Sequence, residues 1–215
     1  MKRYREKDLK NFERDYLGRI ICPSGDYTAI KYFKECCIFD KDCYFNHYTL
    51  FAAGSVFEKS CYFGNSCCFG AECIFGSECV FSNYCTFSDD SVFCDHCIFG
   101  VGCALGKYCR FGKRCRFEWA CSFGERCSFG SRCSHEGLTN SIYVAIDRIG
   151  SELRKTYFFK AEEGYFVRAG CFFGTLDEFK GRVHETHGGT IHETTYLMAC
   201  DLAVKLLDSQ YEDVK

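Results

Sequence analysis

A six-residue register of cysteine and phenylalanine runs through this 215-residue chain and constrains its fold more than any other feature. Cysteine holds the first position of the register at Cys37, Cys43, Cys61, Cys67, Cys73, Cys79, Cys85, Cys97, Cys103, Cys109, Cys115, Cys121, Cys127 and Cys133. The small residues Thr49, Ser55 and Ser91 hold the places between. Two residues later, phenylalanine recurs from Phe39 to Phe129 with the single exception of Leu105, and glycine often follows it. Such a period indicates stacked repeats.

The spacing inside each unit predicts a short strand followed by a corner. A small and a large residue two positions apart point the same way in a strand, and the residue between them points outward. We expect the glycine after phenylalanine to let the backbone turn the corner. Three units make a coil of about 18 residues, and coils stack at about 4.8 Å. The register therefore predicts a mainly β fold: a triangular parallel β-helix of about six coils over residues 19–138. It extends back through Phe33 and Tyr27 to Ile21, and ends where His135 takes a phenylalanine position.

This pattern resembles the hexapeptide-repeat superfamily of left-handed β-helices. Those proteins have an aliphatic inward residue, a small residue two positions before it and a glycine after it. Here phenylalanine and cysteine take the first two places. The resemblance implies a left-handed helix, and it raises acyl transfer as an alternative function. The family's acyltransferases use a histidine base between the subunits of a trimer, usually beside a projecting loop. His47 and His96 stand at corners, but no insertion interrupts the register from 37 to 133.

The twenty cysteines are interpreted as core residues. A buried thiol behaves as a small apolar group, which suits a position between stacked phenylalanines. Metal sites are typically built from CxxC pairs or from clustered cysteine and histidine, and a parallel ladder holds the Cβ atoms too far apart for disulfides. Metal, redox and disulfide roles remain the less favoured alternatives. We expect no cofactor.

Two outward columns are apolar where a solvated helix would be polar. They consist of Ile38, Val56, Ile74 and Val92 on one face, and of Tyr44, Tyr62, Val80 and Ile98 on the next. Apolar stripes of this kind mark a covered or associating surface. Three coverings remain open: the terminal segments of the chain, a second copy in a homodimer, or a host partner.

Charge is polarised along the repeat, although the whole chain carries only −2. Residues 37–106 carry −6, and residues 107–133 carry +5. The predicted partner-binding band comprises Lys107, Arg110, Lys113, Arg114, Arg116, Arg126 and Arg132, together with Trp119. Such a band suits an acidic protein surface or phosphates. A solvated face is the alternative interpretation, and direct nucleic-acid binding is the less favoured form of the hypothesis.

The flanking segments are predicted to cap the repeat. Leu9, Phe12, Tyr16 and Leu17 have helical spacing and Gly18 is a stop signal, so a capping helix is expected within residues 1–18. Residues 139–215 predict an α+β unit that caps, dimerises, or does both. It comprises a strand at 141–149, a hairpin turning at 162–164, a helix from a Thr175–Glu178 capping box to Gly188-Gly189, and a helix over 192–208.

The only histidine cluster is His184, His187 and His192. A metal site needs further convergent ligands, whereas histidine near a helix carboxyl end is also favoured by the helix dipole. We assign no metal site and leave metal binding by these three residues open.

The segment VRAGCFFGTLDEFKGRVHETHGG resembles the tail of uncharacterised phage and prophage proteins that also carry Cys-Phe-Gly repeats. The resemblance implies a mobile-element origin and a partner in the host, either a protein or a ribonucleoprotein complex. The amino terminus lacks the apolar core of a signal peptide, and no apolar run reaches about 18 residues. We therefore expect a cytoplasmic, non-enzymatic inhibitor of a host defence or nucleic-acid-acting complex, similar to anti-CRISPR proteins. The alternatives are a hexapeptide-type acyltransferase and a structural scaffold.

Overall fold

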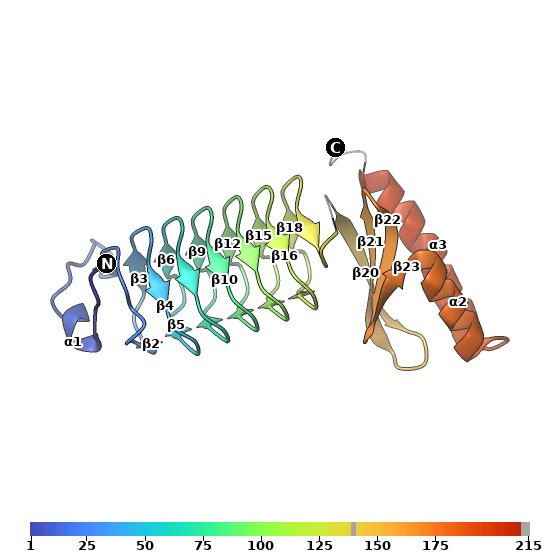
Figure 1. Cartoon of the computed structure of the whole chain (residues 1–215), viewed down its shortest axis with the longest axis horizontal. Helices are drawn as coiled ribbons and strands as arrows, with labels where there is room; N and C mark the ends of the chain where they lie inside the picture. The colour runs from blue at the N-terminus through green and yellow to red at the C-terminus, as the bar shows by residue number, and fades with distance from the viewer. Residues whose placement is uncertain (139–140, 212–215) are drawn as a thin grey trace. The chain divides into compact units, whose positions relative to one another are not determined.

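Two units make up the chain in the computed structural model, which describes residues 1–138 and 141–211. The first unit is Met1–Gly137, and the second begins at Leu138. In Figure 1 the coils of the first unit are coloured from blue to yellow and stack side by side.

Three parallel sheets form the sides of the first unit, and each strand pairs with the strands one coil before and after it. The first sheet contains β1 (Ile20–Cys22), β3 (Cys37–Phe39), β6 (Val56–Phe57), β9 (Ile74–Phe75), β12 (Val92–Phe93), β15 (Arg110–Phe111) and β18 (Ser128–Phe129). The second contains β4 (Tyr44–Phe45), β7 (Tyr62–Phe63), β10 (Val80–Phe81), β13 (Ile98–Phe99), β16 (Arg116–Phe117) and β19 (Ser134–His135). The third contains β2 (Tyr32–Phe33), β5 (Leu50–Phe51), β8 (Cys68–Phe69), β11 (Thr86–Phe87), β14 (Ala104–Leu105) and β17 (Ser122–Phe123).

The pairing confirms the predicted β-helix with 18-residue coils. Val80, for example, lies between Tyr62 and Ile98, each 18 residues away. The predicted left-handedness of the helix stays a prediction.

Stacked aromatic rings fill the interior. Phe57 lies parallel to Phe75 of the next coil, with ring centroids 4.9 Å apart and planes 3° apart. Within one coil, Phe57 and Phe63 meet edge to face at 5.0 Å and 85°. Both arrangements are favoured by the charge distribution of the rings. His135 continues the column at its end, lying 5.0 Å from Phe117 and nearly parallel to it.

The cysteines of the register are buried, as predicted, apart from the half-buried Cys127. Their thiols also donate hydrogen bonds to the coil below. Cys79 Sγ lies 3.5 Å from the carbonyl oxygen of Glu58, and Cys97 Sγ lies 3.5 Å from that of Gly76, in both cases 21 residues earlier. The shorter serine side chain stays within its own corner, as when Ser55 Oγ donates to Ala52 O at 2.8 Å.

The predicted role of the glycines that follow phenylalanine is wrong. The left-handed residue of each corner is instead the one before cysteine, and it is usually not glycine: Ser60 has φ 60° and Glu78 has φ 64°. Gly70 shows why glycine is needed one position after phenylalanine. A Cβ on Gly70 would lie 2.5 Å from the backbone nitrogen of Ala53 in the coil below. These glycines therefore permit close stacking of the coils.

The first coil departs from the predicted register. Cys22 pairs with Phe39 and is fully buried, whereas Ile21 pairs with Ile38 and is 40% exposed. The predicted inward position of Ile21 is therefore wrong, because β1 and β3 are offset by 17 residues. The lost residue falls between Cys22 and Tyr27, since Tyr27 still stacks on Phe45 at 5.6 Å.

The amino-terminal segment covers the first coil with aromatic rings more than with a helix. The helix α1 (Glu6–Leu9) has four residues, and Tyr16 and Leu17, which were predicted on its apolar side, are 91% and 63% exposed. Tyr4 takes the capping role, with its ring stacked 5.0 Å from that of Tyr27. Phe12 meets Tyr4 edge to face at 5.2 Å. The helical prediction fails because this segment is held by pairing with the first coil, as at the Tyr4 N–H to Asp26 O bond of 2.8 Å.

The second unit is an antiparallel sheet with two helices packed on one face. Its elements are β20 (Ile142–Ile149), β21 (Arg154–Ala161), β22 (Gly164–Ala169), β23 (Phe172–Thr175), α2 (Leu176–His187) and α3 (Ile191–Tyr211). The predicted strand, hairpin and two helices are confirmed. Phe158 and Val167 pack against helix residues such as Phe179 and Ala203. The neighbours Tyr157 and Phe159 belong to a separate aromatic cluster, as strand alternation requires.

Candidate interaction surface

The corners of the β-helix form three edges that carry different chemistry. The first edge joins the first sheet to the second through the corners at 40–43, 58–61, 76–79, 94–97, 112–115 and 130–133. The second edge joins the second sheet to the third, through the corners at 46–49, 64–67, 82–85, 100–103 and 118–121. The third edge returns to the first sheet through the corners at 52–55, 70–73, 88–91, 106–109 and 124–127.

Five basic residues of the predicted band lie together on and beside the first edge. We call them the basic ridge: Arg110, Lys113, Arg114, Arg116 and Arg132. Arg110 is the outward residue of β15 in the first sheet, and Arg116 is the outward residue of β16 in the second. Lys113 and Arg114 stand in the corner between them. Arg132 occupies the position of Arg114 one coil later, with φ 60° against 56°. All five are exposed.

Most of the ridge carries uncompensated charge. Arg116 forms an ion pair with Glu118 at 2.6 Å. Within the described parts of the chain, Arg110, Lys113, Arg114 and Arg132 form no ion pair. Because like charges held on adjacent coils repel one another, an anionic partner is expected to stabilise this arrangement.

The other three residues of the predicted band lie elsewhere. Lys107 and Arg126 are on the third edge, where Lys107 pairs with Glu125 at 3.2 Å and Arg126 lies 5.9 Å from the ring centroid of Tyr108. Trp119 is on the second edge and is 47% exposed. The eight residues therefore do not form one surface. Their positions within the 18-residue period contain the signal that separates them.

The first edge changes sign along the helix. The corner residue that precedes each cysteine is, in successive coils, Asp42, Ser60, Glu78, His96, Arg114 and Arg132. The acidic part also contains Asp95, whose carboxylate accepts the backbone N–H of Lys113 at 2.7 Å. This bond fixes the corner from which the ridge projects.

The predicted apolar columns are partly exposed along the second and first sheets. On the second sheet, Tyr44, Tyr62 and Ile98 are 43%, 41% and 39% exposed, and Val80 is half-buried. On the first sheet, Ile74 is 45% exposed and its neighbour Val92 is half-buried. The rings of Tyr44 and Tyr62 lie 6.1 Å apart, so the stripe is continuous from coil to coil.

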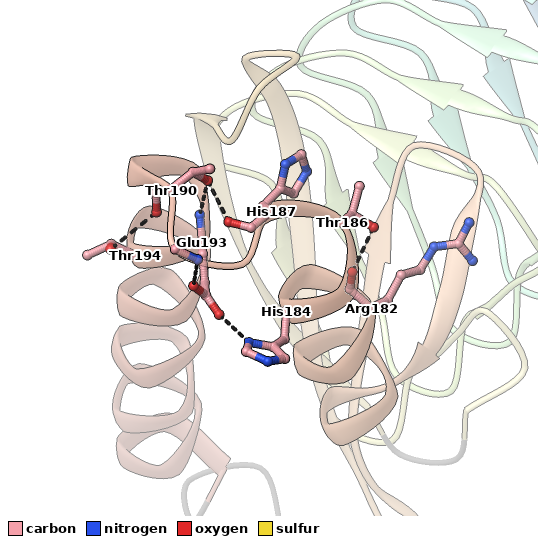
Figure 2. Close-up of polar contacts among 8 residues, drawn as sticks. Arg182, His184, Thr186, His187, Thr190, Glu193 and Thr194 are labelled. Carbon is pink, nitrogen blue, oxygen red and sulfur yellow. Dashed lines mark hydrogen bonds and ion pairs between the residues drawn. The ribbon is translucent and has the colours of Figure 1, made fainter.

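The histidine cluster forms the connection between α2 and α3, shown in Figure 2. Glu193 accepts hydrogen bonds from the backbone N–H of Gly189 at 2.7 Å, and it lies 2.7 Å from Nδ1 of His184. The contact with His184 holds the pKa of Glu193 below its usual value. Across the described residues, no group of three or more His, Cys, Asp and Glu side chains is arranged to hold a metal ion. The arrangement is that of a helix cap.

His47, one of the two corner histidines considered for acyl transfer, has a structural role. Its Nδ1 accepts the backbone N–H of Asn65 at 2.8 Å. Asn65 Oδ1 in turn accepts from Asn83, and Asn83 Oδ1 accepts from Val101. This ladder of side-chain acceptors links successive corners of the second edge.

No model of a protein family, no curated protein and no solved structure matches this chain. The relation to hexapeptide-repeat proteins and to phage proteins therefore stays a prediction. Among the described residues, no helix has the length and apolarity needed to cross a membrane.

Proposed function

We propose that this chain is a non-enzymatic binding protein that recognises an acidic protein surface through the basic ridge. The observation that carries the proposal is the group of four basic side chains, held on adjacent coils without ion pairs. Stacked repeats form a rigid surface of the kind used for recognition. A charged ridge on such a surface steers association and selects a partner by complementarity.

The biological role follows from the resemblance of the carboxyl-terminal segment to phage and prophage proteins. We place the protein in the host cytoplasm, where it would inhibit a host defence or nucleic-acid-acting complex. Such complexes hold nucleic acid with basic clefts but present acidic patches elsewhere. A protein ridge of opposite charge can engage those patches without binding nucleic acid itself.

Affinity capture from a bacterial lysate, with and without nuclease, tests the proposal. The ridge variant carries Arg110→Glu and Lys113→Glu, and the matched control carries Lys107→Glu and Arg126→Glu on the third edge. Both variants change the net charge by the same amount. We expect one stoichiometric host protein with the wild type and the control, and its loss with the ridge variant, because buried charge reversal abolishes electrostatic docking.

Three outcomes contradict the proposal. Capture that survives in the ridge variant removes the ridge from the interface. Capture that is lost equally in both variants shows a dependence on net charge alone. Capture that disappears after nuclease treatment identifies nucleic acid as the ligand.

A further inference from the structure

The outward column of the second sheet is graded in size along the helix. In successive coils it reads Tyr44, Tyr62, Val80, Ile98, Arg116 and Ser134. Large rings thus lie at one end and a small hydroxyl at the other. The aromatic and aliphatic members form an exposed stripe, and such stripes mark surfaces that associate.

The first edge, which borders this sheet, is graded in charge along the same direction. Asp42 and Glu78 lie in the early coils, and Arg114 and Arg132 in the late ones. The second edge borders the sheet on its other side and is nearly uncharged, with Glu118 as its only acidic residue in these corners. A surface graded in both size and charge fits a copy of itself that runs the opposite way.

We propose that the second sheet is the interface of an antiparallel homodimer. Its two-fold axis lies parallel to the strands, between Val80 and Ile98. This operation stacks sheet on sheet and keeps the first edge of one protomer beside the first edge of the other. A self-complementary patch of this kind is what a two-fold interface requires.

Coil counting from the axis gives the contacts. Val80 meets the partner's Ile98, Tyr62 meets the partner's Arg116, and Tyr44 meets the partner's Ser134. The central contact is apolar, the next places a guanidinium against an aromatic ring, and the outermost sets a large residue against a small one. Each contact occurs twice because of the symmetry.

The first edge adds complementary charges at the rim. The same counting places Asp42 beside the partner's Arg132 and Glu78 beside the partner's His96. Lys59 and Lys113 also come to the same level, but they stand one residue further from the second sheet along each corner. Opposite charges at a rim fix register and orientation more than they add affinity.

Two other arrangements fit worse. Parallel protomers would set Arg116 against the partner's Arg116. An antiparallel dimer through the first sheet would bring Glu72 of the third edge beside the partner's Asp90, because those corners precede β9 and β12. Like charges in contact disfavour both arrangements.

The expected dimer is weak. Six strands stacked at about 4.8 Å give a face about 25 Å long, which yields an interface at the low end of the specific range. We therefore expect a dissociation constant on the order of 10 µM.

Sedimentation velocity over about 1–200 µM measures this equilibrium, since the range brackets a micromolar constant. The wild type is expected to rise from 24.7 kDa toward twice that mass. Val80→Glu is expected to raise the dissociation constant at least tenfold, roughly the effect of burying an unpaired charge. Val92→Glu, an equally half-buried outward position of the first sheet, is the matched control and should leave it unchanged.

A charge swap tests the antiparallel register. Asp42→Arg and Arg132→Asp should each weaken self-association about tenfold. An equimolar mixture of the two single variants should recover wild-type affinity, because every rim pair then joins opposite charges. Circular dichroism checks that each variant is folded.

A wild type that remains monomeric throughout overturns the proposal, and so does loss of the dimer in Val92→Glu but not in Val80→Glu. Failure of the mixture to recover affinity overturns the antiparallel register. Dimerisation of the Arg110→Glu/Lys113→Glu variant is measured separately, so failure of the dimer and failure of partner binding are distinguishable.

Discussion

The inward cysteine is chosen at each corner for both its volume and its reach. Its side chain is small enough to lie between phenylalanine rings, and its thiol reaches a carbonyl oxygen 21 residues earlier. Thr49, Ser55 and Ser91 satisfy carbonyls of their own corners instead. Both choices leave the backbone carbonyl of the corner with a partner, which buried polar groups need.

Alkaline solution should destabilise the fold through these thiols, and Cys73 provides the test. Desolvation by burial raises the pKa of Cys73 from 9.0 to about 12. Between these values the unfolded chain releases the proton and the folded chain keeps it, so stability is lost as pH rises. Urea unfolding of wild type and Cys73→Ser at pH 8 and about pH 10.5 should show the difference between them shifting by about 2 kcal/mol in favour of serine. A difference independent of pH would contradict the assigned shift.

At the level of the element, the coil is decided by how closely its corners stack. A glycine after phenylalanine lets the corner approach the backbone below it, whereas the strained left-handed residue is usually an ordinary L-residue before cysteine. The second unit follows more local rules. The Thr175 hydroxyl accepts the N–H of Glu178 at 3.3 Å, and Glu178 accepts the N–H of Thr175 at 2.8 Å. This reciprocal capping box is readable from sequence because it spans four residues.

Two glycine-to-alanine substitutions should act in opposite directions. In Gly70→Ala the new Cβ would lie 2.5 Å from the backbone nitrogen of Ala53, and we expect a loss of about 1–3 kcal/mol from overpacking. In Gly181→Ala the Cβ on α2 meets nothing within 4 Å, and helix propensity should add about 0.5–1 kcal/mol. Urea titration with a probe in each unit measures both. A Gly70→Ala variant as stable as wild type would refute the close-approach explanation.

At the level of the whole molecule, a β-helix must end its stack without exposing an open coil. Tyr4 is buried against Tyr27, and residues 2–4 pair with Asp26 through two backbone hydrogen bonds of 2.8 Å. This pairing converts the first open edge into a covered one. Uncovered edges of parallel coils are templates for further strands.

Removal of this cap should promote growth from the end of the helix. A Tyr4→Ala/Phe12→Ala variant is expected to lose about 3–5 kcal/mol of stability, the usual result of truncating buried aromatic residues. It should also form species larger than a dimer that increase with concentration, which light scattering detects. Tyr16→Ala, at a side chain 91% exposed in the same segment, is the control and should match wild type. A double variant without larger species would show that the cap does not limit growth.

The sequence by itself determined the coil length, the inward cysteine and phenylalanine columns and the outward apolar columns. These follow from a covalent period of 18 residues, which places Val80 between Tyr62 and Ile98 whatever the details of packing. The same period contained the division of the basic band among three edges. The helices α2 and α3 were also predictable, because their signals lie within a few residues of each other.

Only the tertiary structure decided the features that depend on contacts between coils. The 17-residue offset of the first coil, the capping by Tyr4 in place of a long helix and the role of Gly70 each arise where one coil meets another segment. The same holds for the ridge: ion pairing separates Lys107, held by Glu125, from Arg110, Lys113 and Arg114. Distances across neighbouring coils are set by packing, which a one-dimensional pattern does not contain.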